Sequence, residues 1–377
     1  MQDGERAQLV GRLTEWRPRW GVLSVYLHVD PGDRRRAWRI ELRERLRALA
    51  QDTPAHDAQR AFKAASSRVL ERFPEEGLIP EGRGHVGFVE VAETPSEIWR
   101  SMQTPPRRVE VGLAPRALLR PLIEIFDEAP YVGVVVLSAE RVRLLEWSLG
   151  AIRQLDDWEL VLWSRDWRER KAERSLPGGG EWTSASGRDQ FDQRLDANRR
   201  RFLREVGQRV RRERGGRGWR HLIAFGSERY TEELGPGLGK NSESAHFAGQ
   251  DLISAPEHEI AERVEAEVRK INTARELRLV GELEEAIGAT PGAALGPLEV
   301  LDVLAEGRVR HLIFDADREY EGQPLRVPGG DQGDDGLPVT ERMIELAVAT
   351  SAEITPLMGE PATRMVDHGG VGALLRY

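Results

Sequence analysis

The sequence predicts an α/β fold, because short apolar runs of strand length alternate with helix-like stretches along most of the chain. The length of 377 residues exceeds one ordinary core, which predicts two or three domains. The chain ends in the apolar run GVGALLRY, which suits one strand and is too short for an ordinary helix. A terminal segment this apolar must be tied into a sheet, so we expect a central core strand there.

The first third of the chain is expected to contain two strands around a pair of helices. The run GVLSVYLHV (21–29) predicts a strand, and RRRAWRIELRERLRALA (34–50) predicts a helix with an apolar stripe. A second helix is expected over roughly 56–73, and HVGFVEVA (85–92) is typical of a strand.

The rest of the chain continues the alternation. Residues 129–147 predict a hairpin whose polar turn runs from Ser138 to Arg141. The further helices are expected at roughly 190–214, from about 255 into RLVGELEEAIG, at 297–309 and at 340–352, and the further strands at 221–227, 310–316, 353–358 and the terminus. We expect domain boundaries near residues 128 and 255. They divide the chain into an N-terminal α/β domain (1–127), a central domain (128–254) and a C-terminal domain (255–377).

Composition excludes several classes of protein. The chain has 40% hydrophobic and 31% charged residues, which is a globular balance with extra charge. It contains no cysteine, so disulfides, thiolate metal sites and a cysteine nucleophile are excluded. No run of apolar residues is long enough for a membrane helix, and MQDGERAQLV lacks the layout of a signal peptide. We therefore expect a cytoplasmic protein without a membrane partner.

Charge is distributed unevenly along the chain. Between Arg188 and Arg214 there are ten arginines against five acids, a net charge of +5, whereas the whole chain carries −8. Residues 272–377 hold nine arginines and nineteen acids. A cationic helix in an acidic protein can follow a phosphate backbone, because neutralised phosphates release counterions. The alternative is a solvated helix face whose arginines pair with local acids.

Familiar enzyme motifs fail on their context. GRGHVG (82–87) matches a dinucleotide-binding pattern, but a strand follows it where a helix is needed. GPGLGKNS (235–242) lacks the first glycine and the Ser or Thr of a P-loop. The eight histidines show no metal-ligand spacing, and G-x-S-x-G is absent. The loop DQGDDG (331–336) lacks a complete calcium-loop pattern. No metal or cofactor is expected.

The C-terminal segment GGVGALLRY resembles the closing strand of archaeal and eukaryotic class-one peptide chain release factors and Pelota. The matching positions are Gly369, Gly370, Gly372, Leu375, Arg376 and Tyr377. APRALLRPLIEIFDEAPYVGVVVLSAERVRLLEW (114–147) resembles the entry into the central domain of the bacterial and archaeal relatives of these factors, and LAEGRVRHLIFD (304–315) resembles their third domain. The resemblance covers about residues 115–377. The family that the chain resembles includes Balon-type ribosome hibernation factors.

The resemblance implies a three-part translation factor that occupies the ribosomal A site in the manner of a tRNA. It implies a central RNase H-like domain, and a C-terminal α-β-α domain like kink-turn-binding ribosomal proteins that docks a translational GTPase such as elongation factor Tu. It also implies a monomer. The cationic helix falls in the central part, which must meet ribosomal RNA, and the acidic segment falls where a protein partner is expected.

The chain departs from these release factors in its catalytic and decoding motifs. It contains no Gly-Gly-Gln, and the nearest equivalent is the loop 177–190, which holds GGGEWTSASGRDQ. Gln190 with Gly187 is the candidate pair for orienting water toward a peptidyl-tRNA ester, a positioning role rather than strong base catalysis. The alternative for Gln190 is a surface residue in the first turn of a helix. AGQ (248–250) is discounted. The Asn-Ile-Lys-Ser motif is also absent, so stop-codon decoding is not expected.

Candidate RNA contacts come from the loop and the helix that follows it. Trp182 is a candidate for stacking on an unpaired base, with loop anchoring as its alternative. A basic stretch at Arg34, Arg35, Arg36 and Arg39 is ranked lower. The cationic candidates are Arg188, Arg194, Arg199, Arg200, Arg201 and Arg204.

Three functions are consistent with these observations. The first is a non-hydrolytic ribosome-binding factor for rescue or hibernation. The second is a peptidyl-tRNA hydrolase that uses Gln190. The third is an interaction scaffold that kept the fold and left the ribosome.

Overall fold

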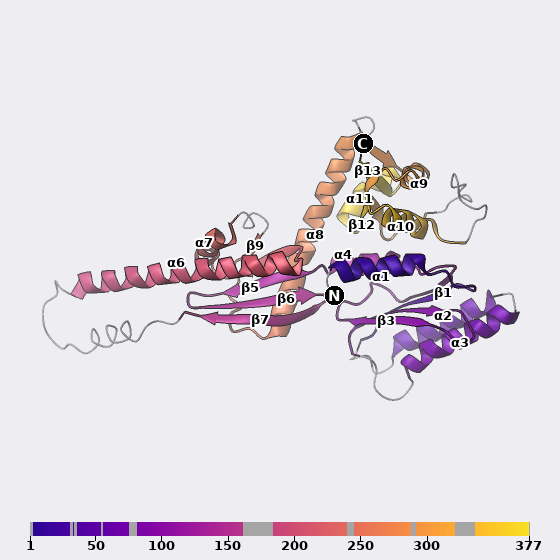
Figure 1. Cartoon of the computed structure of the whole chain (residues 1–377), viewed down its shortest axis with the longest axis horizontal. Helices are drawn as coiled ribbons and strands as arrows, with labels where there is room; N and C mark the ends of the chain where they lie inside the picture. The colour runs from indigo at the N-terminus through magenta and orange to yellow at the C-terminus, as the bar shows by residue number, and fades with distance from the viewer. Residues whose placement is uncertain are drawn as a thin grey trace.

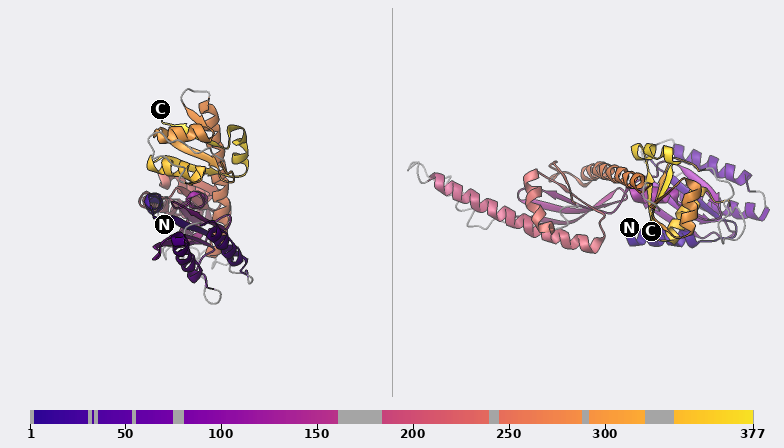
Figure 2. Two further views of the ribbon diagram at one scale, coloured as in Figure 1. Left: turned by 90° about the vertical axis from the view of Figure 1, so that its right-hand side faces the viewer. Right: turned by 90° about the horizontal axis from the view of Figure 1, so that it is seen from above.

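Three β-sheets, each with its own helices, follow one another along the chain (Figure 1). The structure is a computed structural model that describes residues 3–30, 33, 36–53, 56–74, 81–160, 184–239, 245–287, 292–320 and 336–376. The α/β fold class is confirmed. The central sheet projects from the rest of the molecule together with one long helix, α6 (Ser184–Arg217) (Figures 1 and 2).

The first sheet is antiparallel, with the strand order β3-β2-β1-β4. Side chains alternate along β1, so that Leu23, Val25 and Leu27 share a core with α2 and α3, and Tyr26 shares one with α1. Because helices cover both faces of the sheet at β1, nearly all of its side chains are buried, and this explains the continuous apolar run in the sequence. The elements are α1 (Asp3–Glu15), β1 (Val22–His28), α2 (Ala37–Gln51), α3 (His56–Arg72), β2 (Gly84–Glu90), β3 (Glu97–Met102) and β4 (Glu110–Ala114).

The central sheet has the order β7-β6-β5-β8-β9, in which β5, β6 and β7 form an antiparallel meander and β8 and β9 extend it in parallel. This is the strand arrangement of the RNase H-like fold. The predicted hairpin is confirmed, because the Ser138 N–H donates to the Arg141 carbonyl at the turn (2.8 Å). The elements are β5 (Val132–Leu137), β6 (Arg141–Ser148), β7 (Ala151–Glu159), α6, β8 (His221–Phe225), α7 (Glu228–Leu238) and β9 (Ala245–Ala248).

The third sheet has the order β10-β13-β11-β12, so the terminal strand β13 is central, as predicted. Gly369 and Gly370 precede it with φ of 77° and 78°, the left-handed region that favours glycine. Tyr377 lies outside the described residues. The elements are α8 (Glu257–Ile287), β10 (Ala293–Leu295), α9 (Pro297–Ala305), β11 (Val309–Asp315), α10 (Val339–Ala349), β12 (Glu353–Leu357), α11 (Glu360–Arg364), the 3-10 turn η2 (Val366–His368) and β13 (Val371–Leu375).

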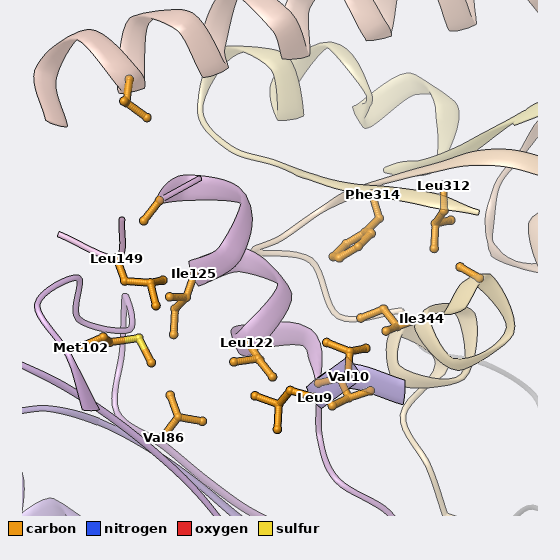
Figure 3. Packing of buried hydrophobic residues seen from close by; sticks show 14 of the residues in the cluster. Leu9, Val10, Val86, Met102, Leu122, Ile125, Leu149, Leu312, Phe314 and Ile344 are labelled. Atoms are coloured by element: carbon orange, nitrogen blue, oxygen red, sulfur yellow. The ribbon is translucent and has the colours of Figure 1, made fainter. Parts of the chain in front are cut away.

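The three sheets share one continuous apolar cluster around helix α4 (Arg120–Glu128). Leu122 and Ile125 of α4 belong to this cluster together with Leu9 of α1 and Phe314 of β11, and in Figure 3 Ile125 lies beside Leu149 and Leu122 beside Leu9. Leu9, Leu122, Ile125 and Phe314 are each at most 3% exposed. The junction between the three parts is therefore a packed core, which fixes how the projecting central sheet is held.

Some described elements were not predicted. Strands β3 and β7 are polar because each lies at the edge of its sheet, where one side and much of the backbone face solvent. Helix α1 was missed as well, since its buried residues Leu9, Val10 and Leu13 pack against residues far along the chain. In the part of the chain that the structure describes, no helix is long and apolar enough to cross a membrane.

Candidate nucleic-acid interface

Helix α6 packs on the central sheet through one apolar face. Leu203, Val206 and Val210 are each at most 2% exposed and share a core with Val135 and Leu144 of the sheet. Their spacing of three and four residues keeps them on one side of the helix. This packing leaves the opposite side of α6 open along its length.

The open side of α6 carries a row of arginines, which we call the arginine face: Arg194, Arg201, Arg204, Arg211 and Arg212. All five are exposed. At 100° per residue Arg194, Arg201 and Arg212 lie opposite the buried leucine and valines, and Arg204 and Arg211 lie at the flank nearer to α7. At 1.5 Å per residue, Arg201 and Arg212 are about 17 Å apart along the helix. Glu205 is exposed beside Arg201, so the face keeps a strong net positive charge.

Two of the predicted RNA contacts are engaged with acids of the protein. Arg199 donates to Glu140 (3.0 Å) and lies 3.6 Å from Asp196, and its side chain is only 19% exposed. Arg200 lies 3.5 Å from Glu233 of helix α7. Their charge is thus partly neutralised, in contrast to Arg201, which donates to the neutral Asn198 (3.1 Å).

Two residues of the arginine face were missed in the sequence. Arg211 and Arg212 are exposed, and they lie about two helical turns beyond Arg204. The helical period of RRRFLREVGQRVRR (199–212) could have identified them, because its apolar residues mark the buried side of the helix and the arginines away from that side are exposed. A neighbouring arginine, Arg209, lies over the Trp158 ring at 5.7 Å from its centroid and packs on β7.

The position of α6 is fixed by a close helix crossing with α7. A Cβ added at Gly207 would lie 2.7 Å from the Leu234 carbonyl oxygen, and one added at Gly237 would lie 2.3 Å from the Arg204 carbonyl oxygen. Only glycine allows the two backbones to approach this closely. Because Gly237 packs against the backbone of Arg204, this crossing fixes the position and rotation of α6, and with them the direction of the arginine face.

The C-terminal end of α6 is anchored by a buried carboxylate. Glu146 of β6 accepts hydrogen bonds from Trp219 (3.0 Å), Arg217 (3.3 Å) and Arg153 (2.8 Å). Burial raises the pKa of Glu146, but the hydrogen bonds from its partners outweigh it and the net pKa is lowered. Glu146 is therefore held as a carboxylate, and the helix end is tied to the sheet.

The predicted catalytic pair falls at the other end of this helix. Gly187 and Gln190 belong to α6, which begins at Ser184, and so does Arg188. The side chains of these residues and all of Trp182 lie outside the described residues. Figure 1 shows that this end of α6 is the tip of the projecting arm, far from the three-part junction.

Two histidines near α6 have pKa values that are lowered by burial. His221 and His246 stack edge to face with ring centroids 5.7 Å apart. Burial, followed by the charges of His246 and Arg214, lowers the pKa of His221 to about 4. Among the described residues, no group of three or more metal-ligating side chains forms a candidate metal site.

The motif GRGHVG is a turn and a strand in the structure. β2 begins at Gly84, so no helix N-terminus faces a phosphate there. In the basic N-terminal stretch, Arg36 donates to the Pro74 carbonyl (3.2 Å) and Arg39 is buried in α2. Arg34 and Arg35 lie outside the described residues.

The chain thus combines three α/β parts, and the central part carries the cationic helix α6 on a five-stranded sheet. Residues 130–266 match the model of bacterial archaeo-eukaryotic release factor family 5, so this central segment is similar to that release-factor family. The matched segment contains the whole arginine face.

Solved structures of an archaeal release factor and of Pelota are only weakly similar to this chain. An archaeal translation termination factor, aRF1, is 17% identical over 100% of this chain and 99% of its own, with a TM-score of 0.28. Pelota of Archaeoglobus fulgidus is 14% identical over 78% of this chain and 79% of its own, with a TM-score of 0.35. A model of ribosome-bound archaeal Pelota with ABCE1 reaches a TM-score of 0.42 at 14% identity, over 78% of each chain. None of the curated proteins matches the sequence.

Proposed function

We propose that this protein binds the ribosomal A site through the arginine face and acts in ribosome rescue or hibernation, without decoding stop codons. The observation that carries this proposal is an exposed row of arginines on a helix that projects from the body of a release-factor-like chain. Phosphate contacts supply most sequence-independent affinity for RNA, and arginine makes bidentate contacts with phosphate.

The proposal assigns a role to each part of the chain. Residues 128–254 carry the RNA-binding arm in a tRNA-like manner, and residues 1–127 sit toward the decoding region. Residues 255–377 dock a protein partner, for which a translational GTPase such as elongation factor Tu is the candidate because this part is strongly acidic. The protein acts as a cytoplasmic monomer. Co-purification of elongation factor Tu with the wild-type chain, compared between GTP and GDP, tests the docking.

The first experiment is co-sedimentation of the purified chain with empty 70S ribosomes across a salt series. We expect binding at low salt that weakens steeply as salt rises, because counterion release gives a linear dependence of log K on log salt. Absence of binding at low salt, with or without elongation factor Tu, contradicts the proposal and leaves the interaction scaffold as the function to examine.

A second candidate function is peptidyl-tRNA ester hydrolysis. It is favoured by the position of Gln190 in the second turn of α6, at the end of the helix that forms the tip of the arm (Figure 1). Here the amide of Gln190 would orient a water toward the ester carbonyl, and Gly187 would allow close approach of the backbone. Peptide release from loaded ribosomes at the same rate by wild type and Gln190→Ala would remove Gln190 from this role.

A further inference from the structure

A groove runs between helices α2 and α3 at the outer face of the first sheet. It has a volume of about 670 Å³ and an apolar floor that includes Leu46, Phe62 and Leu70. This volume lies in the range of small-molecule sites, from about 300 to 1,000 Å³. Figure 1 places α2 and α3 at the end of the molecule away from the tip of α6, so the groove is separate from the arginine face.

The walls of the groove are cationic. Arg43 and Arg47 line it from α2, and Lys63 lines it from α3, while its described lining includes no carboxylate. Ser66 also lines the groove, although its hydroxyl oxygen is buried. An apolar floor under cationic walls is complementary to a ligand with an apolar body and an anionic head.

Arg39 extends the positive charge of α2 beyond the residues that line the groove. It precedes Arg43 by four residues, so Arg39, Arg43 and Arg47 form one row along α2. The residue is 7% exposed, and its Nε and Nη1 atoms are buried with no hydrogen-bond partner. Burial, then the charges of Arg43 and Arg36, lower the pKa of Arg39. Arg39 does not line the groove, and its positive charge adds to that of the neighbouring Arg43, which favours an anion at Arg43.

We propose that the groove between α2 and α3 binds a small amphipathic anion, an apolar chain or ring that carries a carboxylate or phosphate head. The apolar body lies on Leu46, Phe62 and Leu70. The head is held by Arg43, Arg47 and Lys63, the cationic residues that line the groove. This site does not depend on ribosome binding.

The test is calorimetric titration of the full chain with decanoate and with decyl phosphate, using decanol and acetate as controls. We expect binding of at least one of the two anions, and at most weak binding of decanol, which lacks the charge, and of acetate, which lacks the apolar body. Preference for decanoate or decyl phosphate identifies the head group. Equal binding of decanol and both anions, or no binding of either anion, overturns the proposal.

Two substitutions locate the site. Lys63→Glu is expected to weaken binding by about tenfold or more, because it replaces a charge-assisted contact with repulsion. Arg68→Glu is the matched control: it makes the same charge change on α3 at an exposed residue that pairs with Glu71 and does not line the groove. An equal loss in both variants would mean nonspecific electrostatics and would contradict the assignment.

Arg39→Met separates binding from folding. Replacing a buried unpaired charge by an apolar side chain is expected to keep or raise the melting temperature. Because Arg39 does not line the groove, this substitution is expected to change the affinity for the anion less than Lys63→Glu does. A loss of affinity as large as that of Lys63→Glu would contradict the assignment of the head group to Arg43, Arg47 and Lys63.

Discussion

The carboxylate of Glu341 accepts a hydrogen bond from the backbone N–H of Leu119 at 2.6 Å, although 222 residues separate them in sequence. It also accepts the Arg120 N–H (3.0 Å), so a side chain of α10 caps the first turn of α4. An acid at a helix N-terminus is stabilised by the unpaired N–H groups and the helix dipole. This contact ties the third sheet to the helix at the centre of the shared core.

The Glu341 cap predicts a pH-dependent stability. Burial raises the pKa of Glu341 from 4.5 to about 7, against the opposing effect of the two backbone donors and Arg120. Between these pH values the folded state keeps a proton that the unfolded chain has released, so the free energy of unfolding falls as pH rises through the window. Relative to wild type, Glu341→Gln should therefore gain up to about 3 kcal/mol between pH 4.5 and 7.

Urea unfolding at a series of pH values measures this contribution. Glu282→Gln, at an exposed position on α8, serves as the control and should keep the wild-type pH dependence. If Glu341→Gln shows the same pH dependence as wild type, Glu341 does not change its protonation in this window.

The helix crossing at Gly207 predicts opposite effects of two alanine substitutions in one helix. Gly207→Ala should destabilise the chain by about 1–3 kcal/mol, because the new methyl group overlaps the α7 backbone. Gly215→Ala has no atom within 4 Å of the added carbon and should stabilise α6 by up to about 1 kcal/mol. Thermal unfolding of the two variants checks this, and equal melting temperatures would disprove the close crossing.

The arginine face predicts a change in the salt dependence of ribosome binding. The triple variant R201Q/R204Q/R212Q should lower the slope of log K against log salt by roughly one unit for each phosphate that an arginine no longer neutralises. The matched control R269Q/R310Q/R364Q removes the same charge from exposed positions of the C-terminal part, which is not proposed to contact RNA. An equal effect in both variants would mean that net charge alone drives the binding.

A second long-range contact lies at the other end of α4. The Asp127 carboxylate accepts hydrogen bonds from Arg220 of the central part (3.1 Å) and from Arg275 of α8 (2.5 Å). Asp127→Asn leaves Arg275, whose side chain is 15% exposed, without its acid, and should cost about 3 kcal/mol.

An exposed acid provides the comparison for Asp127. Asp317→Asn breaks the pair with Arg107, in which both side chains are at least a third exposed, and should cost less than about 1 kcal/mol. Chemical denaturation of the two variants measures the difference. A decrease in stability of similar size in both would show that the Asp127 contacts do not lock the three parts together.

Much of the fold could be predicted from local sequence. The strand at Val22–His28, the hairpin turn at Ser138 and the central position of the terminal strand all follow from apolar runs and turn residues. These features depend on neighbouring residues and on period, which the sequence displays directly. The edge strands β3 and β7 escaped prediction because their side chains face solvent and lack that signal.

The sequence by itself determined that the protein is α/β, that the helix expected over roughly 190–214 is cationic, and that its segments resemble release factors and Pelota. Only the tertiary structure decided which arginines are engaged with acids, since Glu140 and Glu233 come from elements outside α6. It also decided that Glu341 caps α4 and that two nitrogens of Arg39 are buried without a hydrogen-bond partner. The physical reason is that neutralisation and burial depend on contacts between residues far apart in the chain, whereas net charge and periodicity are local.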